Sequence, residues 1–321
     1  MNRLLSVAPM MDCTDRHCRY FHRQLSRHAL LYSEMIVDKA IIFGERERFL
    51  RFNPIEHPVA LQLGGNDPKL LAEATKIAVD FGYDEVNLNV GCPSTRVESG
   101  NFGAALMKKI DLVRSCVEAM KASAGKIPIT VKSRIGVDDQ NPNEVLPEFI
   151  TKVASSGCSV FIIHARKALL GGLSPKDNRI IPPLQYPLVY EMQNKFPELD
   201  IILNGGLIDL KYIKSVLRNP VAGVMIGREA YENPSILLSV DQDIFDKKDE
   251  PRDMKDAIWN MIEYCNREQA EGTTIKGILK HLKGAFKGQA NSKDFRRLLF
   301  CNQTTDSEKL KKLSNLVPFY A

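Results

Sequence analysis

Residues 85–94 read Glu85-Val86-Asn87-Leu88-Asn89-Val90-Gly91-Cys92-Pro93-Ser94. From Glu85 to Val90 apolar and polar side chains alternate, which is the period of a β-strand. Gly91 and Pro93 then mark a turn. A thiol at the end of a strand is a candidate acid, nucleophile or metal ligand, although a free cysteine is more often a small buried hydrophobe. The place of Cys92 in a larger repeat decides between these interpretations.

Apolar runs bounded by turn residues recur along the chain and predict eight strands. They are Leu4–Ala8, Leu30–Ser33, Val59–Leu63, Glu85–Val90, Ile129–Lys132, Val160–His164, Ile201–Asn204 and Gly223–Ile226. Helical patterns fill most of the intervals, at Asp67–Phe81, Gly103–Ala124, Glu144–Ser156, Leu188–Phe196 and Asp209–Arg218. In the second interval, Glu34–Asn53, a helical pattern is obscured by many charged residues. Alternating strands and helices demand a parallel sheet, so eight units predict a (β/α)8 TIM barrel. An open doubly wound sheet is the alternative, but no G-x-G-x-x-G motif opens the first unit.

The repeat fades after about Leu238, and the rest of the chain has a different character. Residues 241–253 are acid-rich and irregular, as in a linker. Beyond them only helical patterns occur, at Met254–Glu271, Thr274–Lys287, Lys293–Phe300 and Asp306–Asn315. We therefore expect a barrel domain at residues 1–240 and a small all-helical domain at residues 241–321.

Composition narrows the class of protein. The 321 residues suffice for one barrel with an appendage. No apolar run approaches the roughly 20 residues of a membrane span. Seven cysteines without a C-x-x-C pair argue against a disulfide framework and a zinc ribbon. We expect a soluble, cytoplasmic, monomeric protein without a metal site, and the net charge of +5 permits an anionic partner.

Polar residues follow most of the predicted strands at their carboxyl ends, the edge that carries the active site in barrel enzymes. They stand in Pro9-Met10-Met11-Asp12, Gln62-Leu63-Gly64-Gly65, Asn89-Val90-Gly91-Cys92, Lys132-Ser133-Arg134, His164-Ala165-Arg166, Asn204-Gly205-Gly206 and Gly227-Arg228. A single histidine or lysine would more often be a surface or core residue. Amide, thiol, ammonium and imidazole groups at successive strand ends indicate one catalytic site.

The last two strand ends predict a phosphate site. Asn204-Gly205-Gly206 and Gly227-Arg228 offer backbone N–H groups beside a guanidinium. Loops after strands seven and eight of such barrels commonly bind phosphate. A phosphate site, a lysine on strand five and a thiol after strand four together favour FMN as cofactor. Lys132 and Gln62 would then meet the pyrimidine edge of the flavin, and Cys92 would lie beyond it.

Basic residues mark the helical tail. Lys276, Lys280, Lys283 and Lys287 share one face of the predicted helix, apart from an apolar stripe. A solvated face of an ordinary packed helix would look the same. Lys293, Arg296 and Arg297 follow with only Asp294 nearby, which favours a surface for RNA phosphates.

With these residues in view, the chain resembles the tRNA-dihydrouridine synthases, most closely the DusA type, over essentially its whole length. The resemblance rests on APMMDCTDRHCR (8–19), ALQLGG (60–65), EVNLNVGCPS (85–94), VKSRIG (131–136), FIIHARKA (161–168), GLSPKDNR (172–179), NGG (204–206) and GREAYENP (227–234). Order and spacing both agree with the family. Ser133 and Leu169 depart from it, since the family has threonine and tryptophan there.

The resemblance implies an FMN enzyme that uses NADPH to reduce the C5=C6 bond of uridines in the tRNA D-loop, at positions 20 and 20a. It implies that Cys92 is the proton donor. It implies FMN contacts at Pro9, Met10, Met11, Gln62, Lys132, His164, Asn204, Gly205, Gly206, Gly227 and Arg228. It implies tRNA contacts at Asn89, Lys176, Arg179, Lys293 and Arg296.

Two alternatives agree with part of the sequence. An FMN barrel acting on a free small molecule, of the dihydroorotate dehydrogenase or old-yellow-enzyme kind, would explain Cys92, Lys132 and the phosphate site. It would not explain the basic tail or the basic loop at residues 167–179. An RNA-binding or chaperone protein with an inactive barrel would explain the tail, but not the set of polar strand ends.

Overall fold

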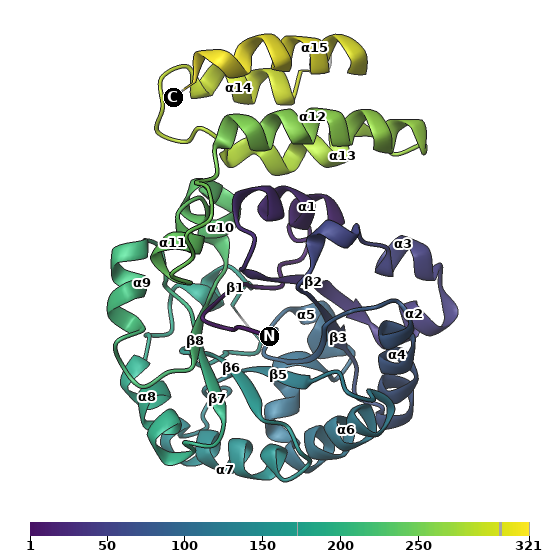
Figure 1. Cartoon of the computed structure of the whole chain (residues 1–321). Helices are drawn as coiled ribbons and strands as arrows, with labels where there is room; N and C mark the ends of the chain where they lie inside the picture. Colours follow the sequence, from purple (N-terminus) through teal and green to yellow (C-terminus); the bar gives the residue numbers. More distant parts are fainter. Residues whose placement is uncertain (172, 302–303, 321) are drawn as a thin grey trace.

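A computed structural model describes residues 1–171, 173–301 and 304–320. Eight parallel strands form a closed barrel in the order β1 to β8, with helices around it (Figure 1). The strands are β1 Leu5–Val7, β2 Leu30–Val37, β3 Val59–Gly64, β4 Glu85–Val90, β5 Ile129–Arg134, β6 Val160–His164, β7 Asp200–Asn204 and β8 Gly223–Ile226. The barrel closes where β8 pairs with β1, with Leu5 beside Val224 and Val7 beside Ile226. The predicted (β/α)8 barrel is confirmed.

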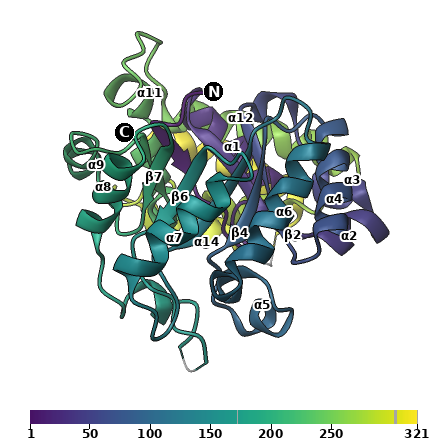
Figure 2. The ribbon, with the colours of Figure 1, turned by 90° about the horizontal axis from the view of Figure 1, so that it is seen from below.

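The helices outside the barrel are α1 Arg16–Leu25, α2 Asp38–Phe43, α3 Arg46–Leu50, α4 Pro68–Asp80, α5 Thr95–Ser99, α6 Ile110–Ser123, α7 Pro142–Ala154, α8 Tyr186–Lys195, α9 Leu210–Val216 and α10 Arg228–Glu232. Figure 2 shows α5, which follows β4, at one end of the barrel and the N-terminus at the other. No helix among the described residues is long and apolar enough to cross a membrane.

Several elements differ from the prediction. The segment Glu34–Asn53 continues β2 and then forms α2 and α3. Gly103–Ala124 is not one helix, because a 3-10 turn (η2, Gly103–Lys108) precedes α6, and Lys109 between them has φ −133° and ψ 57°. Helix α1 was not predicted at all.

The two faces of the barrel wall bury different side chains. Outward residues of the strands, such as Val86, Leu88 and Val90 on β4, belong to the large apolar core under the helices. A smaller apolar cluster is formed by Ala8, Leu30, Tyr32, Ala60, Val160, Ile162, Ile202 and Met225, from β2, β3 and β6–β8 and the residue after β1. One part of the barrel interior holds buried polar side chains instead, and they hydrogen-bond with one another. They are Gln62 on β3, Glu85, Asn87 and Asn89 on β4, and Thr130 on β5.

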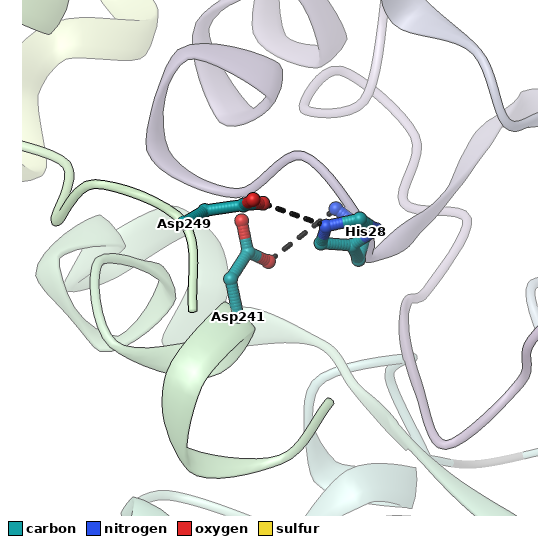
Figure 3. Close-up of side chains that lie close together, drawn as sticks. All are labelled: His28, Asp241 and Asp249. Atoms are coloured by element: carbon teal, nitrogen blue, oxygen red, sulfur yellow. Dashed lines mark hydrogen bonds and ion pairs between the residues drawn. The ribbon is translucent and has the colours of Figure 1, made fainter. Parts of the chain in front are cut away.

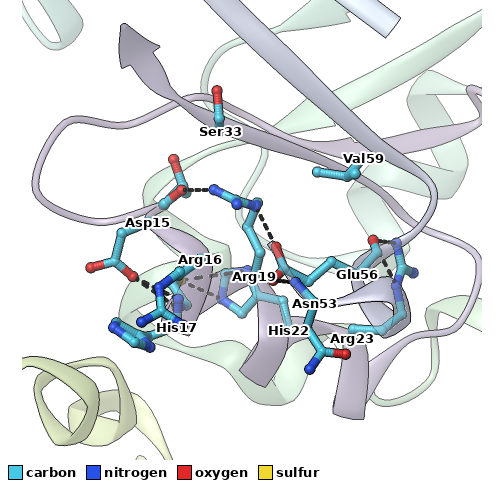
Figure 4. Close-up of polar contacts among 12 residues, drawn as sticks. Asp15, Arg16, His17, Arg19, His22, Arg23, Ser33, Asn53, Glu56 and Val59 are labelled. Atoms are coloured by element: carbon cyan, nitrogen blue, oxygen red, sulfur yellow. Dashed lines mark hydrogen bonds and ion pairs between the residues drawn. The ribbon is translucent and has the colours of Figure 1, made fainter. Parts of the chain in front are cut away.

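A buried ion pair and hydrogen bonds to the backbone attach α1 to the 3-10 turn η1 (Pro54–Glu56) just before β3 (Figure 4). Arg19 Nε lies 2.7 Å from Glu56 Oε2, and these side chains are only 4% and 0% exposed. Arg23 donates to the backbone carbonyls of Ser26, Ala29, Glu56 and Pro58 at 2.8–3.1 Å. Arg19 and Arg23 of α1 therefore point inward, where a carboxylate and backbone carbonyls accept their hydrogen bonds.

The tail consists of α12 Met254–Ala270, α13 Ile275–Leu279, α14 Ser292–Leu299 and α15 Asp306–Leu316, with α14 and α15 outermost (Figure 1). It docks on α1. Tyr264 stacks on Tyr20 with ring centroids 4.0 Å apart, and Arg16 Nη2 lies 2.5 Å from Glu268 Oε2.

The linker between barrel and tail begins with a short helix, α11 Val240–Asp243, so the prediction of an irregular segment from Asp241 onward is wrong at its start. Asp241 and Asp249 both point toward His28 (Figure 3). The three side chains offer ligand atoms within 4.8 Å of one another. The Asp241 carboxylate, however, already accepts hydrogen bonds from Ser26 Oγ and the backbone N–H of Arg27, at 2.5 and 2.7 Å. We infer that these contacts attach the linker to the loop after α1.

The predicted helix Thr274–Lys287 is also wrong as one element. Helix α13 is followed by a 3-10 turn, η5 Lys280–Gly284, after which Ala285 is extended. Gly284 lies so close to the barrel that a Cβ atom there would be 2.6 Å from Pro234 Cδ and 2.8 Å from the Glu232 carbonyl oxygen. The α-helix ends at Leu279 and the close contact lies at the end of the following 3-10 turn, so the four lysines do not form one continuous stripe.

Replacing Glu56 by alanine should destabilise the protein by about 3–5 kcal/mol, because Arg19 would remain as a buried charge without its partner. Urea unfolding of both proteins measures the difference. The control is Asp294→Ala, which removes the partner of Arg297 in a pair whose side chains are 83% and 52% exposed. That variant should unfold like the parent, and an equally small effect of Glu56→Ala would contradict the assigned role.

Candidate active site

A cavity of about 610 Å³ opens at the carboxyl end of the barrel. Residues predicted from the strand ends line it together, namely Pro9, Met10, Met11, Gln62, Asn89, Cys92, Lys132, His164, Asn204, Gly205, Gly206, Gly227 and Arg228, and so does Arg179, which the family resemblance implied. The parallel strands cause this convergence, since all of them end at the same edge. One cavity thus holds a thiol, an amine, an imidazole, three amides and two guanidinium groups from this set.

Three predicted residues lie elsewhere. Lys176 is exposed and directly precedes the 3-10 turn η3 (Asp177–Arg179), which carries Arg179. Lys176 and Arg179 belong to the motif GLSPKDNR (172–179), whose first residue, Gly172, is outside the described residues. Lys293 and Arg296 line a separate groove of about 960 Å³ beside α14 and α15, together with Arg297 and Lys312.

The turn after β4 fixes the backbone of Cys92. Its N–H donates to Asn89 Oδ1 at 2.9 Å, and its carbonyl oxygen accepts from the N–H of Ala104 at 2.9 Å. The Sγ atom lies 3.5 Å from Ser94 Oγ, and the residue is half-buried. The thiol is therefore held at the cavity wall by a turn whose shape depends on Asn89.

Lys132 on β5 is joined to β7 and, through β7, to β8. Its Nζ donates to Asn204 Oδ1 at 2.9 Å, and Asn204 Nδ2 donates to the carbonyl oxygen of Met225 at 2.7 Å. Burial lowers the pKa of Lys132 to about 7, and the positive charge of Arg134 acts in the same direction. An anion or a strong acceptor in the cavity would favour its ammonium form.

Other cations surround the imidazole of His164. Burial, followed by the charges of Arg134 and Lys132, holds the pKa of His164 well below its usual range, so the ring is neutral. Its Nδ1 is buried and has no hydrogen-bond partner among the described residues. Arg134 donates to the carbonyl oxygens of Lys167 and Asn178 at 3.1 and 2.9 Å, and burial lowers its pKa to about 10.

The backbone after β7 forms a narrow cradle. Gly205 and Gly206 have φ of 111° and 72°, which side-chain-bearing residues rarely adopt. A Cβ atom on Gly206 would also lie 2.6 Å from Leu184 Cδ1. Arg228 begins α10 directly after β8 and lines the same cavity. A cradle without side chains next to guanidinium groups fits a phosphate group.

Sequence reasoning missed several residues that line the cavity, among them Cys13, Met35 and Glu232, and it placed Arg134 at this edge without assigning it a role. Cys13 is a second thiol, and burial raises its pKa. Cys13 and Arg134 each lie within two residues of a predicted site residue, so proximity to the strand ends was the available signal. Met35 lines the cavity because β2 continues beyond Ser33, with an irregular pairing to β3 between Tyr32 and Met35.

Comparison with known proteins identifies the family. The family model for dihydrouridine synthases (Dus) matches residues 6–318. The chain belongs to the dihydrouridine synthase family. A relative from Synechocystis sp. named tRNA-dihydrouridine(20/20a) synthase is 53% identical over 295 residues, which cover 92% of this chain and 88% of the relative. A relative of the same name from Escherichia coli K12 is 52% identical, with 92% and 85% covered. The resemblance seen in the motifs is confirmed.

A solved structure shares the fold of this dihydrouridine synthase family member at much lower sequence similarity. The old yellow enzyme from Trypanosoma cruzi aligns with a TM-score of 0.54 and 12% identity, over 79% of this chain and 91% of that chain.

The Lys132 amine should titrate near pH 7 in the ligand-free protein. Between about pH 7 and 10 the unfolded chain would carry a proton on this amine that the native protein lacks, so this residue makes the free energy of unfolding rise with pH in that window. Urea unfolding across the window, in parent and in Lys132→Met, measures the contribution. The variant should lack this part of the rise, and parallel curves would mean that Lys132 stays charged.

Proposed function

We propose that this chain is a tRNA-dihydrouridine synthase that reduces the C5=C6 bond of D-loop uridines, at positions 20 and 20a, with FMN as cofactor and NADPH as reductant. The observation that carries the proposal is the single cavity that holds Cys92, Lys132 and the cradle of Gly205 and Gly206. Membership of the dihydrouridine synthase family supports the reaction, and the names of the relatives support the tRNA positions.

The cavity offers groups for each part of FMN. Gly205, Gly206 and Arg228 would hold the phosphate, and Gly227 would let it approach the backbone. Lys132 and Gln62 would hydrogen-bond the pyrimidine edge of the ring. The remaining proposed contacts along the ring and its side chain are Pro9, Met10, Met11, His164 and Asn204. When bound, FMN would supply the hydride, taken from NADPH, to C6 of the uracil.

The chain itself has to supply a proton. Addition of hydride at C6 leaves negative charge shared between C5 and the C4 carbonyl oxygen, and protonation of C5 completes the reduction. A thiol is mostly protonated near neutral pH and can act as the general acid. Cys92 is the thiol that follows the strand end, at the cavity wall. A uridine must leave its stacked position in the tRNA to reach it.

We propose that residues 241–321 form the tRNA-binding part and residues 1–240 the catalytic part. Lys293 and Arg296 are exposed on α14, in the basic groove at α15. Lys280 and Lys283 are less suited than expected. Lys280 Nζ lies 3.3 Å from Asp15 Oδ2, and Lys283 Nζ lies 4.7 Å from the centroid of the Tyr231 ring.

The other proposed tRNA contacts belong to the barrel. Lys176 and Arg179 are exposed, and Arg179 lines the cavity. Asn89 is 8% exposed and uses one hydrogen of its NH₂ group on Gln62, which leaves the other for the flipped base. A barrel that acts on a free small molecule would give no role to the basic groove on the tail.

Cys92→Ala should retain FMN, accept hydride from NADPH and bind tRNA, yet make almost no dihydrouridine. The loss of a general acid should slow reoxidation of the reduced flavin by tRNA by about 10²–10⁴-fold. Stopped-flow absorbance of the flavin measures the two half-reactions separately.

The matched control is Cys13→Ala, because Cys13 is the other thiol that lines the cavity. It should reoxidise with tRNA at close to the parental rate. If Cys13→Ala is the slow variant and Cys92→Ala is not, the proton comes from Cys13. A parent that holds no flavin, or whose reduced flavin ignores tRNA, would overturn the proposed function.

Lys293→Ala combined with Arg296→Ala should weaken tRNA binding and lower the slope of log affinity against log salt by about two, roughly one for each phosphate contact. The control is Lys76→Ala with Lys126→Ala, which removes equal charge from exposed positions on α4 and before β5. Binding measured at several salt concentrations gives both slopes. Equal slopes for the two double variants would show that α14 does not touch the RNA backbone.

A further inference from the structure

A continuous chain of hydrogen bonds runs inside the barrel, along the inner face of β4. Asn89 Nδ2 donates to Gln62 Oε1 at 2.7 Å, and Gln62 Nε2 donates to Asn87 Oδ1 at 2.7 Å. Asn87 Nδ2 donates to Thr130 Oγ1 at 2.8 Å, and Thr130 Oγ1 donates to Glu85 Oε1 at 2.6 Å. All five side chains are at least nine-tenths buried. The chain reaches from the first residue of β4 to the turn that carries Cys92.

The two ends of the chain dictate the orientation of every amide in it. At the cavity end, the backbone N–H groups of Gly91 and Cys92 can only donate, and both meet Asn89 Oδ1, at 3.1 and 2.9 Å. At the other end, the Glu85 carboxylate can only accept. Each amide between them must therefore present its oxygen toward Cys92 and its NH₂ group toward Glu85. Reversing any one of them would place two donors or two acceptors face to face.

Glu85 is anchored so that it stays an acceptor. Its Oε2 receives Arg3 Nη2 at 2.7 Å and Arg3 Nε at 3.2 Å. Its Oε1 also accepts from the hydroxyl of Tyr32. Burial, and then the charge of Glu85, raise the pKa of Tyr32 well above its usual value, so this phenol remains a donor. The charge-paired carboxylate lies at the amino end of β4, at the opposite end of the strand from the cavity.

We propose that Glu85 and Thr130 are positioning residues for the Cys92 turn, acting through Asn87, Gln62 and Asn89. The inference rests on the proposed function, in which Cys92 protonates the uracil and Gln62 meets the flavin. It assigns a role in that reaction to groups at the far end of the barrel that touch neither tRNA nor cofactor.

The physical reason is that Asn89 has two possible orientations of nearly equal shape. In one, Oδ1 accepts from both N–H groups of the turn, and in the other the NH₂ group would face those N–H groups and push the turn away. The chain below Asn89 selects the first orientation together with these N–H groups, because an amide that donates to Gln62 must turn its oxygen to Cys92. A misplacement of about 1 Å at a reacting group can cost about a hundredfold in rate.

Thr130→Val tests the proposal, since it removes the hydroxyl that links Asn87 to Glu85 at nearly unchanged volume. Hydrogen–deuterium exchange of the β4–α5 turn reports on Gly91 and Cys92 directly and needs no activity. Both amides should exchange slowly in the parent and about tenfold faster in the variant, because their acceptor is no longer held. Reoxidation of reduced flavin by tRNA should slow by about tenfold to a hundredfold.

Two matched variants separate positioning from general destabilisation. Thr130→Ser keeps the hydroxyl and should restore parental exchange and rate. Tyr32→Phe removes another buried hydrogen bond to the same Glu85 oxygen, outside the path to Cys92, and should leave both readouts near the parental values. If Tyr32→Phe loosens the turn as much as Thr130→Val does, Glu85 acts only through stability and the proposal fails.

The exchange readout also separates this inference from the proposed function. A parent that never reduces tRNA but shows the expected exchange pattern would overturn the function and leave the chain in place. Unchanged exchange at Gly91 and Cys92 in Thr130→Val would overturn the inference, whatever the activity. Thr130→Ala removes the same hydroxyl if valine does not yield folded protein. Fast exchange of both amides in the parent overturns the inference without any variant.

Discussion

The need to pair every buried polar group inside the barrel is the constraint on which the site depends. Inward residues of most strands are apolar, among them Leu30, Ile162 and Met225, whereas β3, β4 and β5 contribute amides, a hydroxyl and a carboxylate. A buried polar group without a partner costs about 1–3 kcal/mol, so these side chains must satisfy one another. They do so in one direction only, because one end is a carboxylate and the other end is a pair of N–H groups. Apolar and polar side chains alternate along β4. The apolar ones pack in the outer core and the polar ones form the inner chain of hydrogen bonds, so one strand supports both.

Positive charge at the other end of the barrel is not compensated in the same way. Lys132, Arg134, Arg179 and Arg228 line the cavity, against the two carboxylates of Glu229 and Glu232. Burial and mutual repulsion lower the pKa of Lys132 to about 7 and keep His164 neutral. Such an arrangement is held in place by the surrounding fold and becomes favourable when an anionic, hydrogen-bonding ligand enters. The protein thus has a neutralised polar interior at the amino end of the strands and an excess of cations at the carboxyl end.

The sequence sufficed for the barrel and for most of the cavity wall, because strand period and strand ends are local signals. It failed where tertiary contacts overrule local pattern. Helix α1 carries Arg16, Arg19 and Arg23 and resembles a surface segment. Its charges instead meet the carboxylates of Glu56 and Glu268 and the backbone carbonyls of Glu56 and Pro58, which are distant in sequence. The predicted stripe of lysines is wrong because the helix ends at Leu279 and a 3-10 turn follows, which packs Gly284 against Glu232 and Pro234. Asn87 and Thr130 could not be recognised as part of the site, since their partners follow from the register of β3, β4 and β5.

Asp15 connects the cavity to the helical tail. Its carboxylate caps α1 through the N–H groups of His17 and Cys18, and it also receives His281 Nε2 at 2.9 Å and Lys280 Nζ at 3.3 Å. Burial by itself would raise the pKa of Asp15. The hydrogen bond with His281, the charge of His281 and the backbone N–H of Cys18 outweigh burial and hold this pKa well below its usual range. The loop that ends at Asp15 contains Pro9–Met11 and Cys13, which line the cavity. One charged residue therefore fixes both the wall of the cavity and the docking of the tail. In the proposed function, a tRNA bound by α14 would in this way be held at a defined distance from Cys92.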